Sequence, residues 1–215
     1  MLKYQKISSP FKRDVDGTKK LIKDQYTSPV IEYLKNNKWI FTEKVDGTNI
    51  SIHWDGYKIL FHGRTENTNF PKYLYDYLNE TFNTPENEQL FEQMFQNKEV
   101  YLFGEAYGGK IQNGTGYSDD VSFIGFDVVI NGTYLNRENA EMIFKAFGIL
   151  MVPIIINGTI NDAVEFVIQH PNSTISKNKN CFMEGLVGVP DIPIYDNQGN
   201  RIIIKVKYND VKDFN

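Results

Sequence analysis

The chain has 215 residues, which is long enough to bury the core of one domain and too short for two domains of ordinary size. Hydrophobic residues make up 41% of it, with 13 tyrosines and 15 phenylalanines, so the composition excludes a disordered chain and favours a globular fold with aromatic-rich strands. The formal net charge of −4 excludes a uniformly basic surface, so any nucleic-acid contact requires a local basic cleft on an acidic body.

The amino terminus and the cysteine content predict a cytoplasmic location. No run of about eighteen apolar residues is present, and the first six residues lack the apolar region of a signal peptide. We therefore expect no membrane association. Cys181 has no second cysteine to pair with, which fits a reducing compartment, and we interpret it as a small buried residue.

Three strands are predicted in the first third of the chain. Residues 39–43, 49–54 and 57–62 alternate polar and apolar side chains, and Asp55-Gly56 between the last two is a typical two-residue hairpin turn. Lys44 is therefore expected in the loop between two strands, with Arg64 after the end of the third.

The rest of the chain mixes helices and strands. Apolar spacing predicts helices over 71–82 and around 90–95, buried strands over 99–105 and 121–130, and a helix that is capped by Asn136 and closed by Gly148. A strand over 150–156, a helix capped by Asn161 and ending before Pro171, a polar loop over 172–180, and strands over 182–187 and 201–207 follow. The pattern predicts an α+β fold in one domain, residues 1–215.

The stretch 43–49, Glu-Lys-Val-Asp-Gly-Thr-Asn, is the most informative part of the chain. A lysine at a strand end can carry a nucleotide covalently, provided that cationic neighbours or a metal ion favour its neutral form. Gly47 would let the backbone turn tightly beside a phosphate. Asp-Gly is also a common turn dipeptide, so a plain hairpin would show the same pattern. Residues 14–18 end in the same Asp-Gly-Thr but have an aspartate in the lysine position, so Lys44 is the candidate nucleophile.

Further charged motifs follow Lys44 in a fixed order. They are Gly63-Arg64-Thr65, Phe103-Gly104-Glu105-Ala106, Phe126-Asp127, Glu184-Gly185-Leu186-Val187 and Ile204-Lys205-Val206-Lys207. In this order the chain, over residues 39–207, resembles the covalent nucleotidyltransferase superfamily of nucleic-acid ligases and capping enzymes. The motif sequences are most similar to the RNA ligase 2 group, which includes phage RNA ligases and RNA-editing ligases. That resemblance implies two antiparallel sheets flanking a nucleotide pocket, with helices outside, in a fold of the ATP-grasp-like ligase kind.

The resemblance implies an ATP-dependent RNA ligase. Lys44 would attack the α-phosphorus of ATP to form lysyl-AMP, the AMP would pass to an RNA 5′-phosphate, and a 3′-hydroxyl would complete the seal. Lys205 and Lys207 alternate with apolar residues and so share one face, as a catalytic phosphate clamp requires. Glu184 would bind Mg²⁺ or Mn²⁺ through water, and Asp46 would orient Lys44 or a metal-bound water.

The resemblance implies that seven residues bind the nucleotide. Arg64 and Glu105 resemble the pair that holds the ribose hydroxyls, Asn49 would contact the phosphates, and Phe126 would stack on the adenine. Glu43, Lys205 and Lys207 complete this set. Simpler interpretations remain open for several of them: Phe126 as a core residue, Asn49 as a turn residue, Glu105 as a solvated strand-end acid, and the two lysines as a solvent-facing edge.

One position departs from the family pattern. Relatives commonly place a lysine five residues after the glutamate that corresponds to Glu184, where this chain has Val189. Lys177 or Lys179 in the preceding loop could supply that charge; otherwise the later sealing steps would be impaired. His53, His62 and His170 lack metal-ligand spacing and are interpreted as ordinary sheet and helix-end residues.

Two alternative functions remain. The first keeps the chemistry but changes the acceptor, as in a DNA ligase or a capping guanylyltransferase. The second is a nucleotide- or RNA-binding module that does not seal. The expected partners are RNA ends or a nicked duplex, in the cytoplasm or, for a phage-encoded protein, the host cytoplasm. Relatives often append an OB-fold or helical domain after the last motif, and we expect neither in this sequence, so a partner protein or a dimer could supply additional grip.

Overall fold

The computed structural model describes residues 1–65, 68–113 and 116–214, which form two compact units. Unit 1 consists of Met1–Tyr4 and Asp46–Val152, and unit 2 consists of Gln5–Val45 and Pro153–Asn215. Each unit has its own sheet and its own hydrophobic core. The α+β class predicted from the sequence is confirmed, because antiparallel sheets and helices occur in both units. The prediction that both act as a single adenylyltransferase domain stays a prediction.

The described part of unit 1 contains a six-stranded sheet in the order β5-β4-β6-β7-β8, with β9 beside β7. All neighbours pair antiparallel except β7 and β9, which pair parallel. The strands are β4 (Thr48–Trp54), β5 (Ile59–Gly63), β6 (Val100–Tyr107), β7 (Ser122–Ile130), β8 (Thr133–Tyr134) and β9 (Leu150–Met151). The predicted hairpin is confirmed, but its connection is longer than the two residues expected: Trp54 pairs with Ile59, so residues 55–58 join β4 to β5. Gly56 has a φ of +98°, and the Asp55 carboxylate accepts from the backbone N–H groups of Tyr57 and Lys58.

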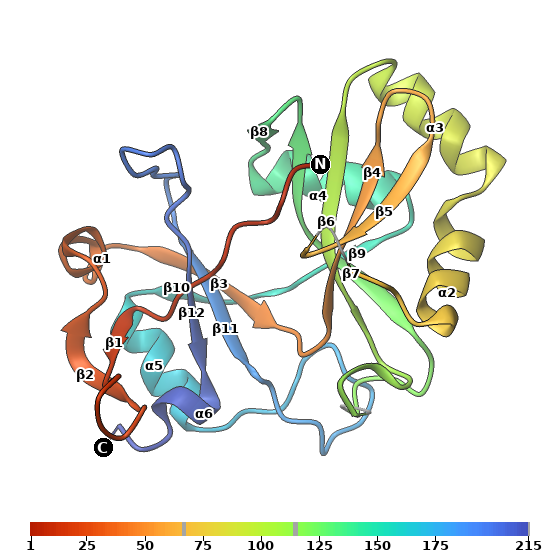
Figure 1. Cartoon of the computed structure of the whole chain (residues 1–215). Coiled ribbons are helices and arrows are strands. Elements are labelled where there is room, and N and C mark those ends of the chain that lie inside the picture. The colour runs from red at the N-terminus through yellow and green to blue at the C-terminus, as the bar shows by residue number, and fades with distance from the viewer. Residues whose placement is uncertain (66–67, 114–115, 215) are drawn as a thin grey trace. The chain divides into compact units, whose positions relative to one another are not determined.

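Three helices cover one face of this sheet (Figure 1). They are α2 (Lys72–Phe82), α3 (Pro85–Phe95) and α4 (Arg137–Ala146), and a short 3₁₀ helix, η1 (Ile111–Asn113), follows β6. Their apolar side chains pack on Ile50, Ile52 and Leu102 from the central strands. The predicted cap of α4 is confirmed, since the Asn136 side chain accepts from the N–H of Asn139 at 2.9 Å.

The opposite face of the sheet carries a smaller aromatic cluster. Tyr101 and Phe103 are buried there, and the amino-terminal segment packs on them through Tyr4. The Tyr4 hydroxyl donates to the Asp127 carboxylate at 2.5 Å. The first four residues are thereby fixed to unit 1, whereas the segment that follows them in sequence belongs to unit 2.

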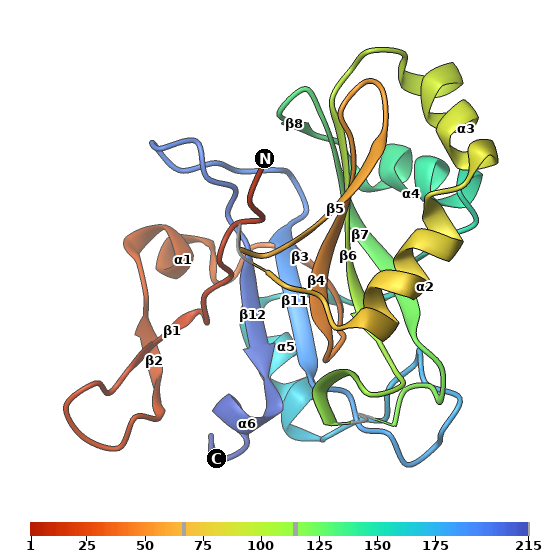
Figure 2. The same ribbon diagram turned by 45° about the vertical axis from the view of Figure 1, so that its right-hand side comes forward.

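The described part of unit 2 contains a four-stranded antiparallel sheet in the order β10-β3-β11-β12, and a separate hairpin of β1 and β2. The strands are β1 (Phe11–Arg13), β2 (Leu21–Tyr26), β3 (Trp39–Lys44), β10 (Ile154–Gly158), β11 (Gly185–Pro190) and β12 (Ile204–Lys207). The helices are α1 (Pro29–Leu34), α5 (Ile160–Ile168) and α6 (Tyr208–Val211). Helix α5 lies against this sheet (Figure 2), where Val164 and Val167 share a core with Phe41 and Leu186.

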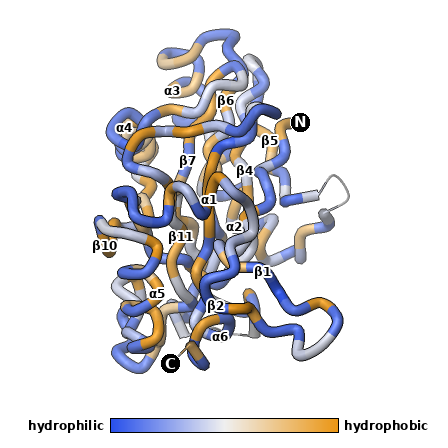
Figure 3. The backbone as a smooth tube through the Cα atoms, turned by 90° about the vertical axis from the view of Figure 1, so that its left-hand side faces the viewer, coloured by the Kyte–Doolittle hydropathy of each residue, from blue (hydrophilic) through white to orange (hydrophobic). Residues whose placement is uncertain are grey.

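The loop between β1 and β2 is hydrophilic apart from the exposed Val15 (Figure 3). It contains Asp16-Gly17-Thr18, the same tripeptide as in the motif that follows Lys44. The Asp14 carboxylate accepts from the N–H groups of Gly17 and Thr18, at 2.9 and 2.7 Å. These bonds lower the pKa of Asp14, chiefly through the Thr18 N–H, and they close the loop as a local turn.

Several sequence-based predictions are wrong in detail. The strand predicted over 182–187 is β11, Gly185–Pro190, and the strand predicted over 201–207 is the shorter β12, Ile204–Lys207. The predicted strand over 150–156 is two strands, because Pro153 has no N–H to continue the ladder: β9 joins the sheet of unit 1 and β10 joins that of unit 2. The cap of α5 is Thr159 and not Asn161, since Thr159 and Asp162 exchange the reciprocal bonds of a capping box. Within the described ranges, no helix has the length and apolar character needed to cross a bilayer.

Candidate active site

The candidate nucleophile lies in a row across three strands of unit 2. Gly185 of β11 is opposite Lys44 of β3 on one side and opposite Lys207 of β12 on the other. Glu184, which precedes Gly185, accepts from Lys44 Nζ through Oε2 at 2.5 Å and from Lys207 Nζ through Oε1 at 2.6 Å. We call Lys44, Glu184 and Lys207 the lysine centre. Lys44 and Glu184 are 140 residues apart in the chain, so only strand pairing brings them together.

A glycine is required in the middle of this row. Gly185 has a φ of +156°, and a Cβ on it would lie 2.0 Å from the backbone oxygen of Val206. The side chains of the lysine centre are partly buried but accessible: Lys44 is 22% exposed, Glu184 14% and Lys207 33%. Lys205 lies two residues before Lys207 on β12, opposite Val187, so the predicted common face of the two lysines agrees with the observed register.

Glu43 has a different environment from its neighbour Lys44. It is 1% exposed, and its carboxylate accepts from the Ser173 hydroxyl at 2.5 Å, the Thr174 hydroxyl at 2.6 Å and the Thr174 N–H at 2.9 Å. These bonds fasten the loop after α5 to the strand that carries the nucleophile. The contact of Glu43 with the nucleotide stays a prediction, while its contact with this loop is observed.

Sequence reasoning missed Ser173 and Thr174, which it placed in a polar loop without a role. Ser173 lies 130 residues after Glu43, so no local spacing connects them. The signal that could have suggested them is the acid at position 43, which falls on the apolar side of the β3 alternation and therefore needs buried donors.

The predicted ribose- and phosphate-binding residues belong to unit 1, at one end of its sheet. Asn49 of β4 is opposite Glu105 of β6. Ile50 is opposite Gly63, the last residue of β5, so the next residue, Arg64, flanks Asn49 on the other side. The sheet thus brings Arg64, Asn49 and Glu105 together on three adjacent strands, while their contacts with a nucleotide stay a prediction.

Gly47 is confined by the neighbouring strand. A Cβ on it would lie 2.2 Å from the backbone oxygen of Ala106 and 2.8 Å from the Glu105 side chain. The Gln112 side chain donates to the Gly47 carbonyl at 3.2 Å. The glycine of the motif therefore allows β4 to begin close against β6, beside Glu105.

Phe126 occupies a bulge in β7. Phe103 pairs with Asp127 and Gly104 pairs with Gly125, so Phe126 is the extra residue between these pairs. Its ring lies edge-on to Tyr4, with centroids 5.0 Å apart, and is partly buried in the aromatic cluster. Stacking of Phe126 on adenine stays a prediction.

The two predicted metal ligands fall in different units, Asp46 in unit 1 and Glu184 in unit 2. Within 1–65, 68–113 and 116–214, no group of three or more His, Cys, Asp or Glu side chains could hold a metal ion by itself. Mg²⁺ commonly uses one or two carboxylates together with waters and substrate phosphates. The donors present therefore fit an ion that arrives with a nucleotide better than a permanent metal centre.

A histidine pair lies in unit 1. His53 Nδ1 and His62 Nε2 are 2.9 Å apart, and His53 Nε2 is 3.1 Å from the Glu99 carboxylate. Burial lowers the pKa of both histidines, although Glu99 raises that of His53 in part. Tyr101 stacks on His53 and donates to Glu99 at 2.8 Å, and burial together with this bond raises its pKa to about 12.

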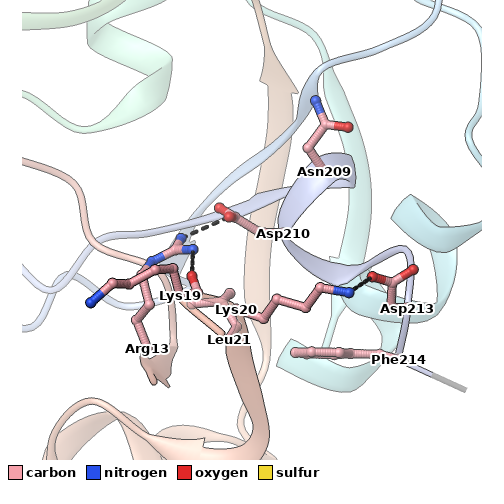
Figure 4. Close-up of a pocket in the computed structure, with 8 residues that line it drawn as sticks. All are labelled: Arg13, Lys19, Lys20, Leu21, Asn209, Asp210, Asp213 and Phe214. Carbon is pink, nitrogen blue, oxygen red and sulfur yellow. Dashed lines mark hydrogen bonds and ion pairs between the residues drawn. The ribbon is translucent and has the colours of Figure 1, made fainter. Parts of the chain in front are cut away.

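A cavity of about 340 Å³ lies in unit 2 beside the β1–β2 hairpin (Figure 4). Two of its basic residues are neutralised: Arg13 pairs with Asp210 at 2.7 Å and Lys20 pairs with Asp213 at 2.6 Å. None of the predicted site residues lines it. Lys19 is a third basic residue of the lining, and its Nζ donates to the Val15 carbonyl.

Comparison with known family models and with solved structures gives RNA ligases in both cases. The model of the RNA ligase family matches residues 37–207. Two solved structures of Naegleria gruberi RNA ligase variants have similar folds: one with AMP and Mn gives a TM-score of 0.62 at 21% identity over 87% of this chain, and one with ATP and Mn gives 0.64 at 21% identity over 97%. The chain spans 54% and 62% of the length of those two proteins.

Proposed function

Because the chain belongs to the RNA ligase family, we propose that it is an ATP-dependent RNA ligase that joins a 3′-hydroxyl to a 5′-phosphate. The observation that carries this proposal is the lysine centre, in which one carboxylate bridges the candidate nucleophile and a second lysine. The similar solved structures of Naegleria gruberi RNA ligase with ATP or AMP and Mn support the choice of nucleotide and of a divalent ion.

The proposed reaction has three steps. The Lys44 ammonium group first leaves its pairing with Glu184 and loses a proton to solvent. The neutral Nζ then forms a bond to the α-phosphorus of ATP as the bond to pyrophosphate breaks, which gives lysyl-AMP. An RNA 5′-phosphate oxygen then takes the AMP from Lys44, and the lysine is regenerated. Finally a 3′-hydroxyl attacks the phosphorus of the 5′-phosphate, AMP leaves, and the new phosphodiester is complete.

The side chains of unit 2 have separate roles in this proposal. Lys207, and Lys205 on the same face of β12, would stabilise negative charge on the phosphate during transfer. Glu184 holds Lys44 and Lys207 at hydrogen-bond distance from one carboxylate, so it would position the nucleophile before ATP enters. Glu184 is also the proposed ligand in unit 2 for Mg²⁺ or Mn²⁺, which would supply further positive charge at the phosphates. Asp46, the other proposed metal ligand, belongs to unit 1.

In unit 1 the roles concern nucleoside recognition. Arg64, Asn49 and Glu105 occupy one sheet end and would bind the ribose and the phosphates. Phe126, on its bulge, would stack on the adenine. A cytoplasmic location, inferred from the single cysteine, is part of the same proposal.

Covalent labelling tests the first step. The protein incubated with α-³²P-ATP and Mg²⁺ should become labelled, and Lys44→Ala should abolish the label. Lys44→Arg keeps a cation beside Glu184, but a guanidinium group that stays protonated is not a nucleophile, so this variant should also remain unlabelled. Lys38→Ala is the matched control, because Lys38 pairs with Asp191 at 3.3 Å on the surface and should leave labelling unchanged.

Comparison of different nucleotides and nicked substrates distinguishes the RNA ligase from the alternative functions. Labelling by GTP in preference to ATP would favour a capping enzyme, and sealing of an all-DNA nick in preference to RNA-ended nicks would favour a DNA ligase. Efficient self-adenylylation without sealing of any nick would identify a module that does not join ends. Label that persists in Lys44→Ala would overturn the proposal.

A further inference from the structure

Three rings from separate segments of unit 2 form a continuous stack. His170, just after α5, lies between Phe182 and Tyr208: its centroid is 4.1 Å from that of Phe182 at an interplanar angle of 15°, and 3.7 Å from that of Tyr208 at 7°. We call these three residues the aromatic stack. It is outside the lysine centre, and none of the roles described above uses it.

The backbone that holds the stack is fixed at each ring. Asn172 and Phe182 form a β-bridge, and the Met183 N–H donates to the Pro171 carbonyl at 2.9 Å. The Tyr208 N–H donates to the Glu184 carbonyl at 3.0 Å. The loop between the bridged residues is also fastened to β3, through the bonds that the Glu43 carboxylate accepts from it.

The stack is continuous along the chain with the lysine centre. Phe182 is two residues before Glu184, and Tyr208 directly follows Lys207. Two of the three rings therefore lie within two residues of the lysine centre in the sequence, Phe182 before β11 and Tyr208 at the start of α6, and His170 joins them through the stack. A group stacked on these rings would be close in the chain to the residues that handle phosphate.

The end ring of the stack is open to solvent. Phe182 is 51% exposed although its ring stacks on His170. Exposure of a single aromatic residue is common, but this ring is also held in place, by its stack on His170 and by the β-bridge of Phe182 with Asn172. The loop that Phe182 closes also carries the exposed Lys177 and Lys179. An exposed aromatic ring in the same segment as exposed lysines is a combination that suits single-stranded nucleic acid, through base stacking and phosphate contacts.

We propose that the Phe182 end of the aromatic stack receives a nucleobase of the RNA substrate, an unpaired or terminal base near the ends to be joined. Lys177 and Lys179 contact the adjacent phosphates. Stacking accepts any base, because every base has a π-face, so the platform aids affinity without selecting a sequence. This inference rests on the proposed function, since it assigns part of the substrate site of the same enzyme.

The decisive experiment compares RNA affinity with self-adenylylation in the full chain. Phe182→Ala should weaken binding of a fluorescent 5′-phosphorylated single-stranded RNA about 5- to 100-fold, the range expected for loss of one stacked base. Labelling by ATP should keep its wild-type rate. Phe182→Trp should restore RNA binding. Phe182→Leu should stay weak, although it keeps an apolar contact with His170 and so protects the fold.

Tyr195→Ala is the matched control. Tyr195 is 49% exposed, close to the value for Phe182, but it lies in the connector between β11 and β12, at the strand ends opposite Glu184 and Lys207. This variant should bind RNA like the wild type. Equal loss in the Tyr195 and Phe182 variants would show a general surface effect and overturn the platform.

Two other outcomes also overturn it. Unchanged RNA affinity in Phe182→Ala would show that no base stacks there. A raised KM for ATP with unchanged RNA affinity would assign the ring to the adenine of ATP instead. Failure of the proposed function has a different signature: the wild type itself would take no label that depends on Lys44.

Discussion

At the scale of single residues, Glu43 provides the most direct test of the site's framework. Glu43→Ala leaves the hydroxyls of Ser173 and Thr174 and the Thr174 N–H without their acceptor. We expect the free energy of unfolding in urea to fall by about 2 to 4 kcal/mol, because bonds to a buried charged group are among the stronger ones. Glu43→Gln should lose less, since its amide oxygen still accepts.

The control is Glu165→Gln, which changes an exposed acid of α5 in the same unit. It should stay within about 0.5 kcal/mol of the wild type. Hydrogen exchange at the Thr174 N–H gives a local readout, slow in the wild type and fast in Glu43→Ala. Equal stability of the Glu43 and Glu165 variants would show that the loop does not depend on the carboxylate.

The histidine pair predicts how stability responds to pH. Burial holds the pKa of His53 and of His62 below the ordinary value of 6.5 in the folded chain. Between that lowered value and 6.5 the unfolded chain binds more protons, so acidification favours unfolding. We expect the free energy of unfolding to fall as the pH drops below about 6.5.

A double variant, His53→Gln with His62→Gln, removes both titrating groups and should flatten this part of the pH profile. Buried carboxylates would still contribute a slope at lower pH, so the comparison is restricted to the window near neutrality. A profile with the same slope in the double variant would assign the effect to other groups.

At the scale of elements, the cap of α5 separates the observed helix start from the one expected from sequence. Thr159→Ala removes the acceptor for the Asp162 N–H and should destabilise unit 2 by about 1 kcal/mol. Asn161→Ala, at the position expected from sequence to be the cap, should have little effect. Thermal unfolding followed by circular dichroism compares the two, and a larger loss in the Asn161 variant would contradict the observed capping box.

Strand β11 depends on its first residue. Gly185→Ala places a methyl group against the Val206 carbonyl and the Lys207 backbone, so we expect the β11–β12 pairing to open and ATP labelling to fall. Gly199→Ala is the control, because Gly199 also has a positive φ, +79°, but nothing within 4 Å of the added Cβ. It should lose only the small strain energy, of about 1 kcal/mol. Similar labelling in both variants would show that the close contact at Gly185 is not essential.

The elements that sequence predicted best are those whose own residues determine them. The hairpin at Asp55-Gly56 and the cap at Asn136 need only local chemistry, and both are confirmed. The prediction of one strand over 150–156 is wrong because its pairing depends on residues far away in the chain. Its apolar run continues through Pro153, and no local pattern reveals that the two halves pair in different sheets. The short β1, β2 and α1 carry too few apolar positions to be recognised before their partners are known.

The site shows the same division. Lys44, Glu184 and Lys207 were recognised from ordered motifs, and the structure pairs them through one carboxylate. The anchoring of Glu43 by the loop after α5 and the aromatic stack of His170 were not predicted, because each joins residues far apart in the chain. Contacts of this kind depend on the final fold, which single-sequence periodicity does not specify.

At the scale of the whole molecule, the net charge of −4 limits how the chain holds a polyanion. Binding has to come from local lysines and arginines, so we expect weak affinity for a nicked duplex and a steep dependence on salt. Each phosphate contact contributes about 0.9 to the slope of log K against log salt. Sealing of a pre-adenylylated RNA nick, measured between about 50 and 200 mM salt, should fall accordingly, whereas ATP labelling should change less.

Fast sealing that is independent of salt over this range would show that contacts other than ionic ones dominate. A second copy of the chain or a partner protein could also add basic surface. Whether a second copy is needed can be tested by the dependence of sealing on protein concentration. Dilution should weaken sealing if a dimer is required and leave it unchanged if a single chain is sufficient.

The carboxylate of Glu184 also acts as a tethered counterion. Its single negative charge balances only one of the two ammonium groups that it contacts, Lys44 and Lys207, so the lysine centre keeps a net charge of +1. An incoming triphosphate would therefore be attracted to this centre, but it would have to compete with a carboxylate that cannot diffuse away. In the proposed reaction, binding of ATP would replace the carboxylate of Glu184 by phosphate at these two lysines, and release of pyrophosphate or AMP would restore the contacts with Glu184. For the proposed ligase, this competition would weaken binding of the nucleotide in the ground state and ease product release between successive rounds.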